Sequence, residues 1–305
     1  MLTRKSKLLL MKVLSLFSVV RGYNIFIIVL AQYLSSIFIL APEKRALDVI
    51  LDWRLFIIVF VSTLTIASGY IINNFYDSEK DLINRPNKSM LDRLVSQKTK
   101  LKVYFGLNFL ATALAYIISW RAALFFAAYI FMIWFYSHKL KKYPIVGNLT
   151  ASLLAVLPFF GILLYFKNFY HVIFAHASFL LLLILIREMI KDLQNIKGDI
   201  ANDYQTIPVR FGEKTSKRII TLLTISTIIP VYILIEKYDV GYMDIYFYIS
   251  LIVLVLFLLK LWKSQTQEEY LQLHNILKSL IVAGVFCILL IDPSVLLNGR
   301  ALLKI

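Results

Sequence analysis

The chain has 305 residues; 60% of them are apolar, 17% are charged, and the formal net charge is +15. Soluble domains draw about a quarter of their residues from Asp, Glu, Lys and Arg, so this composition excludes a soluble globular domain, a disordered chain and a collagen-like repeat. It predicts an integral membrane protein. In that setting the positive charge is typical of basic cytoplasmic loops beside anionic membrane lipids, and no nucleic-acid partner is expected.

Residues 1–21 form a basic and partly apolar N-terminal segment. Lys12 interrupts its apolar stretch, Arg21 follows it, and no small-x-small cleavage site is present. These features favour a helix lying on the cytoplasmic membrane surface over a cleaved secretory signal. Nothing in residues 22–305 marks a soluble second domain, so we expect a single transmembrane domain there.

Apolar runs in the rest of the chain are long enough to cross the ~30 Å hydrocarbon core of a bilayer as helices. We therefore predict an all-α polytopic fold, a bundle of about nine transmembrane helices around a central cavity. The predicted spans are, in chain order, residues 22–41, 54–75, 102–119, 121–137, 146–166, 169–190, 217–236, 243–262 and 277–297.

The distribution of basic residues predicts the orientation. With the N-terminus inside, 25 of the 33 Lys and Arg residues lie in or beside the N-terminal segment and the four cytoplasmic loops, and 8 lie on the opposite side. Because cytoplasmic loops carry an excess of Lys and Arg, this split predicts a multi-pass protein of the cell (inner) membrane with a cytoplasmic N-terminus. The two long acidic loops, after the second and sixth spans, are then both cytoplasmic.

The first acidic loop begins at the end of the second span and reads GYIINNFYDSEKDLINRPNKSM. Asn73, Asp77 and Asp81 recur in it at every fourth position, so on a helix they share one face. Carboxylate and amide oxygens in that arrangement suit a hard divalent cation. Mg²⁺ fits best because it accepts one or two carboxylates together with substrate phosphates. The alternative is a solvated acidic helix end without a ligand.

The second acidic loop, IREMIKDLQNIKGDIANDYQTIPVRFG, begins at the end of the sixth span. Asp192, Asn195 and Asp199 again fall on one helix face. Two acidic stripes facing each other would repel unless cations bridged them, and a diphosphate with Mg²⁺ removes that repulsion. The basic residues interleaved with the acids are expected to contact phosphate oxygens, unless they serve only as topology signals: Arg85, Lys88, Arg187 and Lys191.

At these residues the sequence resembles the UbiA superfamily of intramembrane prenyltransferases, over essentially the whole chain. That family carries an N-D-x-x-D-x-x-x-D motif after the second helix and a second aspartate-rich motif after the sixth. This chain has Asn74 and Asn195 at two positions where the family usually has Asp. Other matching stretches are RGYN at 21–24, INRP at 83–86 and YSHKLKKYPIVGNLTAS between the fourth and fifth spans.

The resemblance implies Mg²⁺-dependent transfer of a prenyl group from an isoprenyl diphosphate, whose tail lies in the apolar bundle and opens sideways to membrane lipids. The forms INRP and REMIKDLQNIKGD are most similar to those of members that use geranylgeranyl diphosphate to prenylate geranylgeranylglyceryl phosphate. The implied metal ligands are Asn73, Asp77, Asp81, Asp192, Asn195 and Asp199, and the four carboxylates among them are the implied catalytic residues. The implied substrate-binding residues are Asn24, Arg85, Lys88, Tyr136, Lys141, Asn148, Arg187 and Lys191.

Three alternatives stay open from the sequence. The acceptor could be aromatic, as in family members of the quinone pathways that prenylate 4-hydroxybenzoate-like rings, rather than a lipid. The carboxylates could belong to a cation-coupled transporter, although transporters place ionisable residues near mid-membrane and these lie at helix ends. The amides Asn74 and Asn195 could mark a scaffold without catalysis.

Overall fold

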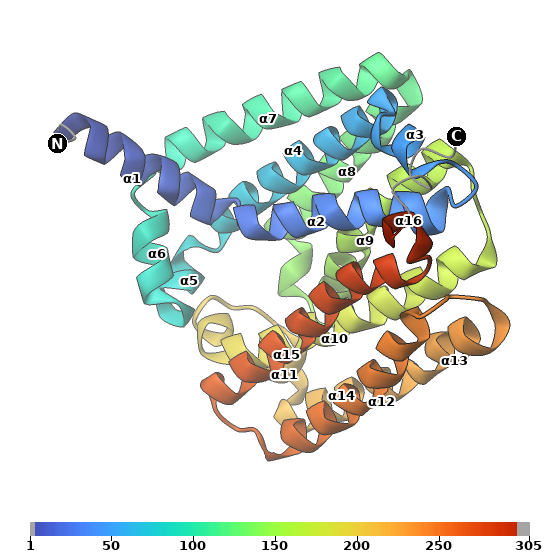
Figure 1. Cartoon of the computed structure of the whole chain (residues 1–305). Coiled ribbons are helices and arrows are strands. Elements are labelled where there is room, and N and C mark those ends of the chain that lie inside the picture. Colours follow the sequence, from blue (N-terminus) through green and yellow to red (C-terminus); the bar gives the residue numbers. More distant parts are fainter. Residues whose placement is uncertain (1–3, 298–305) are drawn as a thin grey trace.

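The computed structural model describes residues 4–297, and every regular element within that range is a helix (Figure 1). Nine helical segments of the described chain are long and apolar enough to cross a membrane, which confirms the predicted all-α polytopic fold. These are α2 (Gly22–Ser35) continued by η1 (Ser36–Leu40), α4 (Trp53–Tyr76), α7 (Gln97–Ile118), α8 (Trp120–His138), α9 (Val146–Phe166), α10 (His171–Ala201), α12 (Glu213–Ser226) with α13 (Ile228–Lys237), α14 (Met243–Lys263), and α15 (Gln267–Cys287) with η3 (Ile288–Leu290).

The predicted limits of the ninth span, 277–297, were wrong at both ends. α15 begins ten residues earlier, at Gln267, and the helical segment ends at Leu290. The first turns of α15 are polar, so apolar runs alone do not predict that the helix begins there. Thr266 and Glu269 form a reciprocal capping box there, which satisfies free N–H groups of the first turn.

The helix that forms the sixth span continues well beyond the predicted span of 169–190. α10 has 31 residues, which corresponds to about 46 Å at ~1.5 Å per residue, against the ~30 Å of a bilayer core. Its last turns therefore extend past the apolar layer, and they carry the second acidic motif on an unbroken helix.

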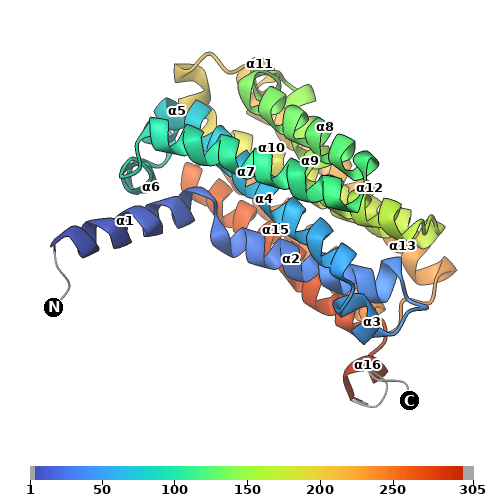
Figure 2. The same ribbon diagram turned by 90° about the horizontal axis from the view of Figure 1, so that it is seen from above.

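Two hydrophobic cores divide the bundle into halves. One is built mainly from α4, α7, α8 and α9, and the other from α10 and α12 to α15, while α2 contacts both α4 and α15 (Figure 2). α4 is the most enclosed span, whereas α7 and α9 turn most of their surface outward. Large apolar side chains such as Phe105 and Phe109 on α7 and Leu153 on α9 are exposed, as expected of faces solvated by lipid.

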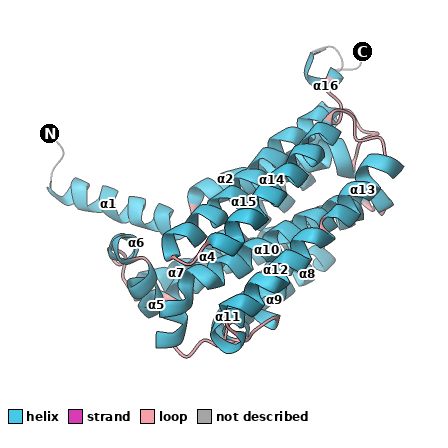
Figure 3. Ribbon diagram, turned by 90° about the horizontal axis from the view of Figure 1, so that it is seen from below, coloured by secondary structure: helices cyan, strands magenta, loops and turns pink. Residues whose placement is uncertain are grey.

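The short helices gather at the two ends of the bundle. α5 (Ser78–Asn84), α6 (Pro86–Asp92) and α11 (Ile207–Phe211) lie at the same end as α1 (Arg4–Val19), whereas α3 (Ala46–Ile50) and α16 (Ser294–Leu297) lie at the other end (Figures 1 and 3). Both acidic motifs thus lie at the α1 end. This common end is what the predicted topology requires.

α1 projects from the bundle (Figure 2). Two hydroxyls fix its second half to α6: Ser15 donates to the carbonyl of Leu91 at 2.8 Å, and Ser18 donates to the carboxylate of Asp92 at 3.0 Å. Its other face exposes Leu14 and Phe17, each more than half accessible. An amphipathic helix of this kind suits the membrane surface, and its interfacial position stays a prediction.

Candidate active site

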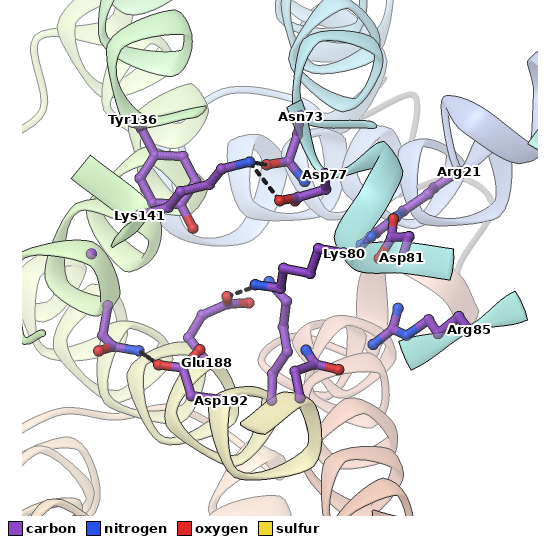
Figure 4. A pocket seen from close by; sticks show the side chains of 14 residues that line it. Arg21, Asn73, Asp77, Lys80, Asp81, Arg85, Tyr136, Lys141, Glu188 and Asp192 are labelled. Carbon is purple, nitrogen blue, oxygen red and sulfur yellow. Dashed lines mark hydrogen bonds and ion pairs between the residues drawn. The ribbon is translucent and has the colours of Figure 1, made fainter. Parts of the chain in front are cut away.

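Two adjoining cavities lie among the spans. The smaller one, called here the polar cavity, has a volume of about 40 Å³ and is lined by charged and amide side chains (Figure 4). The larger one, called here the apolar chamber, has a volume of about 430 Å³ and is lined mainly by aliphatic and aromatic side chains. The residues that line both cavities, and so mark their junction, are Arg21, Asn73, Tyr136, Glu188 and Lys191.

The first acidic motif begins on α4 and continues beyond it. α4 stops at Tyr76, Asp77 occupies the break, and α5 carries Asp81. The backbone N–H of Asp81 still donates to the carbonyl of Asp77 at 2.8 Å. Because the helical spacing survives the break, Asn73, Asp77 and Asp81 all line the polar cavity, as predicted from their shared face.

Lys141, in η2 (Leu140–Lys142), binds the first motif from the side. Its Nζ lies 2.7 Å from the carboxylate of Asp77 and 3.3 Å from Oδ1 of Asn73 (Figure 4). Burial alone would raise the pKa of Asp77, but the charges of Lys141 and Lys80 lower it to about 2. Asp77 is therefore ionised at neutral pH.

The second acidic motif lies on α10. Asp192 accepts a hydrogen bond from Nδ2 of Asn148 at 2.7 Å, and Glu188, one turn earlier, pairs with Lys191 at 2.8 Å. Oδ1 of Asn195 is buried and has no hydrogen-bond partner among the described residues. All five side chains line the polar cavity, so the predicted facing of the two motifs is observed.

Lys80 joins the two motifs. Its Nζ lies 2.5 Å from the carboxylate of Asp199, which also accepts a hydrogen bond from Thr206 at 3.1 Å. Burial alone would lower the pKa of Lys80, but Asp77 and Asp199 raise it above its ordinary value. Asp199 itself is fully buried and does not line the polar cavity, so its position supports a role in orienting Lys80 rather than the predicted direct ligation of a metal.

A glycine allows α5 to approach α10 closely. The N–H of Gly198 donates to Oδ1 of Asn84 at 3.1 Å, and a Cβ at Gly198 would collide with the Asn84 amide. This contact brings Asp81 on α5 and Asn195 on α10 to the same cavity. It gives a physical reason for the Asn of INRP and the Gly of the second motif.

Five of the eight predicted substrate-binding residues line the polar cavity: Arg85, Tyr136, Lys141, Asn148 and Lys191. Asn24 and Arg187 instead line the apolar chamber alone. Lys88 lines neither cavity and pairs with Asp92 at 3.3 Å. The predicted phosphate contact of Lys88 therefore finds no support in its position, because α6 turns this side chain away.

Asn74, the first departure from the family pattern, also points away from the polar cavity. Its Nδ2 donates to Asp92 at 3.1 Å, and its Oδ1 accepts from Lys100 at 2.8 Å. All three side chains are at least nine-tenths buried. Asn74 thus ties α4 to α6 and α7 and contributes no oxygen to the cavity.

Three charged residues of the polar cavity were missed by the sequence analysis: Arg21, Lys80 and Glu188. A signal existed for two of them, since Glu188 lies one helical turn before Asp192 and Lys80 lies within the first motif. Arg21 gave little signal because its position depends on a left-handed backbone, with φ of 51°, and on the ring of Tyr70, 5.0 Å from its guanidinium.

The side-chain oxygens that line the polar cavity suit a Mg²⁺ ion that is bound jointly by the protein and a phosphate group. Oδ1 of Asn195 is free, and the Asp81 carboxylate has no ion pair or hydrogen bond among the described residues. Burial and the charge of Asp77 raise the pKa of Asp81, a tendency that a bound cation would oppose. The described residues contain no group of three or more His, Cys, Asp or Glu that could hold a metal ion. Mg²⁺ is usually bound by one or two carboxylates together with substrate phosphates.

The fold and the site together define a polytopic membrane protein with a charged, oxygen-rich cavity that adjoins an apolar chamber. The UbiA prenyltransferase family model matches residues 11–276. The chain therefore belongs to the UbiA prenyltransferase family, whose members are enzymes that transfer prenyl groups.

Individual relatives agree with this assignment. The chain is similar to digeranylgeranylglyceryl phosphate synthase of Thermococcus sibiricus, with 32% identity over 57% of this chain and 61% of that protein. It is also similar to the synthase of Thermococcus gammatolerans, with 29% identity over 80% of this chain and 88% of that protein.

Two solved structures share the fold. A structure of digeranylgeranylglyceryl phosphate synthase superposes with a TM-score of 0.67 at 21% identity, covering 91% of this chain and 97% of the other. A UbiA homologue from Archaeoglobus fulgidus bound to DMAPP and Mg²⁺ superposes with a TM-score of 0.66 at 16% identity, covering 90% and 98%.

Proposed function

We propose that this enzyme transfers a geranylgeranyl group from geranylgeranyl diphosphate to geranylgeranylglyceryl phosphate, in a Mg²⁺-dependent reaction at the junction of its two cavities. One observation carries the proposal. A small cavity with ionised oxygens and fixed lysines shares five lining residues with a chamber about ten times larger that is lined by apolar side chains. A ligand with an anionic head and a long hydrocarbon tail fits that pair of cavities.

The diphosphate would occupy the polar cavity. Mg²⁺ would be held by oxygens of Asn73, Asp77, Asp81, Asp192 and Asn195, and it supplies charge stabilisation to the leaving diphosphate. Asp199 would act through Lys80, to which it is paired. The cationic and amide side chains available to the remaining phosphate oxygens are Lys80, Arg85, Lys141, Asn148 and Lys191.

The chain's own residues would make the junction suitable for an allylic cation. Lys141 and Lys80 already pair with motif carboxylates at 2.7 and 2.5 Å, so phosphate oxygens can take over ready-positioned donors without a large rearrangement. Tyr136 lines both cavities and offers its ring face where positive charge would develop. The apolar chamber keeps water from the carbon that reacts.

The acceptor assignment rests on the relatives and on the motif forms. The proteins of the two Thermococcus species are synthases of digeranylgeranylglyceryl phosphate. The apolar chamber of about 430 Å³, lined in part by α2, α10 and α15, has a surface that suits the hydrocarbon chain of a lipid acceptor as it suits a donor tail. An aromatic acceptor of the quinone-pathway type is the outcome that would correct this assignment.

We further propose that the end of the bundle that carries both motifs faces the cytoplasm of the cell membrane. The excess of Lys and Arg at this end supports that orientation. A cysteine introduced on α5 or α11 should react with a membrane-impermeant thiol reagent only from the cytoplasmic side.

The test is an assay of purified enzyme in phosphatidylcholine vesicles with radiolabelled geranylgeranyl diphosphate and Mg²⁺. Product is expected with geranylgeranylglyceryl phosphate and not with 4-hydroxybenzoate, and a chelator should abolish it. Asp77→Ala and Asp192→Ala should each lower the rate by about a thousandfold or more. Glu79→Ala is the matched control, because Glu79 is exposed and pairs with Arg93 at the surface rather than with a residue of the polar cavity. Unchanged turnover in both aspartate variants would refute the metal site.

A further inference from the structure

A second group of cations lies outside the polar cavity. Arg187 on α10 and Lys278 on α15 line the apolar chamber and not the polar cavity, and Arg21, before α2, lines both. The three side chains come from three separate parts of the chain: the turn before α2, α10 and α15. The chamber is thus apolar along most of its wall and cationic at one end.

None of these three cations forms an ion pair with a carboxylate among the described residues, although the charge of Arg187 acts on Glu188 and that of Arg21 acts on Asp81. Within the part of the chain that the structure describes, the one side-chain hydrogen bond of Arg187 is to His274, with Nη2 and Nε2 3.3 Å apart, and its buried Nε has no hydrogen-bond partner. The neighbouring Glu188 is already paired with Lys191 at 2.8 Å. The guanidinium of Arg187 therefore keeps unused donors in a largely buried place, which costs free energy unless a ligand accepts from them.

Aromatic rings hold the other two cations. Nζ of Lys278 lies 4.9 Å from the ring centre of Tyr23, and the guanidinium of Arg21 lies 5.0 Å from that of Tyr70. A ring face fixes a cation while its N–H groups stay available. All three cations line the same chamber, where like charges repel one another. An anion between them would remove that repulsion.

The polar cavity and the cationic part of the apolar chamber differ in how their basic side chains are paired. In the polar cavity the lysines pair with aspartates, Lys141 with Asp77 and Lys80 with Asp199. Beside the chamber, Arg187 and Lys278 form no ion pair with an aspartate or glutamate of residues 4–297. A metal-bound diphosphate suits the first arrangement, and a metal-free phosphate monoester on an apolar chain suits the second.

We propose that Arg187 and Lys278, with Arg21 at the border, form a second anion site that binds the phosphate of the lipid acceptor and thereby orients its free hydroxyl toward the polar cavity. The proposal rests on the proposed function, because it gives the acceptor's phosphate a place. It makes Arg187 and Lys278 determinants of acceptor specificity with no contact to the diphosphate.

The experiment separates the two substrates kinetically. Full-length Lys278→Met and Arg187→Lys are compared with wild type in phosphatidylcholine vesicles. Lys278→Met should raise the KM for geranylgeranylglyceryl phosphate about tenfold or more, since it removes a charge-assisted contact. The KM for geranylgeranyl diphosphate and the Mg²⁺ dependence should change by less than about twofold, because those ligands bind elsewhere. Arg187→Lys keeps the charge and should have a smaller effect in the same direction.

Two further arms complete the test. Unphosphorylated geranylgeranylglycerol should be a poor acceptor for wild type, and Lys278→Met should not make it poorer. Lys263→Met, at an exposed position on α14, is the control for loss of a lysine. Melting temperatures in vesicles with and without phosphatidylglycerol show whether the site instead holds a membrane phospholipid.

The outcomes distinguish the proposal from the function on which it rests. If wild type does not use geranylgeranylglyceryl phosphate, the proposed function fails and the acceptor site with it. If wild type uses it and both variants keep its KM, only the second anion site is refuted. A loss of stabilisation by phosphatidylglycerol without a change in KM would assign the cluster to a structural lipid and would likewise refute the proposal.

Discussion

Asn74 and Asn195 carry the same chemical change, an amide where the family usually has a carboxylate, in two very different surroundings. Asn74 is held by Lys100 and Asp92, at 2.8 and 3.1 Å, within a buried network away from the polar cavity. Asn195 lines the cavity, and its Oδ1 has no partner among the described residues. The comparison teaches that a motif position acquires its role from its neighbours: the first amide belongs to a buried hydrogen-bond network, and the second presents an unpaired oxygen to the cavity with one negative charge fewer than Asp.

The largest effect is expected from removing the anion at the centre of the Asn74 network. Asp92→Ala deprives Asn74, Ser18 and Lys88 of their shared acceptor. Leaving buried polar and charged groups unpaired should cost about 3 kcal/mol of stability. The melting temperature in detergent should fall clearly, while the enzyme that remains folded keeps its KM for donor and its Mg²⁺ dependence. A melting temperature equal to that of wild type would contradict the network.

Asn74→Asp restores the usual carboxylate of the first motif and should still not improve the metal site. It places a second carboxylate 3.1 Å from Asp92, and the repulsion should exceed what Lys100 offsets, at a cost of about 1 to 2 kcal/mol. Thermal unfolding measures that loss. Tighter Mg²⁺ binding in this variant would show that the side chain reaches the polar cavity after all.

Asn195→Asp should have the opposite profile. It adds a charge among the cavity oxygens, so the Mg²⁺ concentration that gives half-maximal activity should fall about tenfold, equivalent to about 1.4 kcal/mol. Thermal stability without Mg²⁺ should change little or decrease, because Asp192 lies on the same helix face. Mg²⁺ titration of the prenyl transfer rate measures the shift, and an unchanged titration curve would remove Asn195 from the site.

The smallest effect is expected for Lys88→Ala. Lys88 pairs with Asp92 from a position about one-third exposed, and such pairs contribute about 1 kcal/mol or less. Donor KM should be unchanged, which steady-state kinetics can establish. If the KM for the donor rose as much as in a Lys141 variant, Lys88 would have to be counted among the substrate-binding residues.

The sequence alone predicted the helices and the facing of the two motifs, because apolar runs and a spacing of three or four residues are local properties. Asn73, Asp77, Asp81, Asp192 and Asn195 all line one cavity as that spacing implied.

Pairings between distant elements could not be predicted in the same way. Lys80 lies between two aspartates of its own motif but pairs with Asp199 of the other. Lys88 and Arg187 resembled the other interleaved cations, yet α6 and α10 direct them elsewhere. Which acid a lysine meets depends on how closely two helices approach, and here the packing of Gly198 against Asn84 sets that approach.

The unbroken course of α10 has a consequence for how the substrates arrive. Its 31 residues exceed the hydrocarbon thickness by about 16 Å, taking ~1.5 Å per residue and ~30 Å of core. One continuous helix therefore lines the apolar chamber along part of its length and carries the acidic groups of the second motif beyond the length needed to cross the hydrocarbon core. Under the proposed function, a polyprenyl lipid that entered from the side of the bundle would keep its ionic end in the hydrated layer, so its loading would require no transfer of charge through the hydrocarbon core.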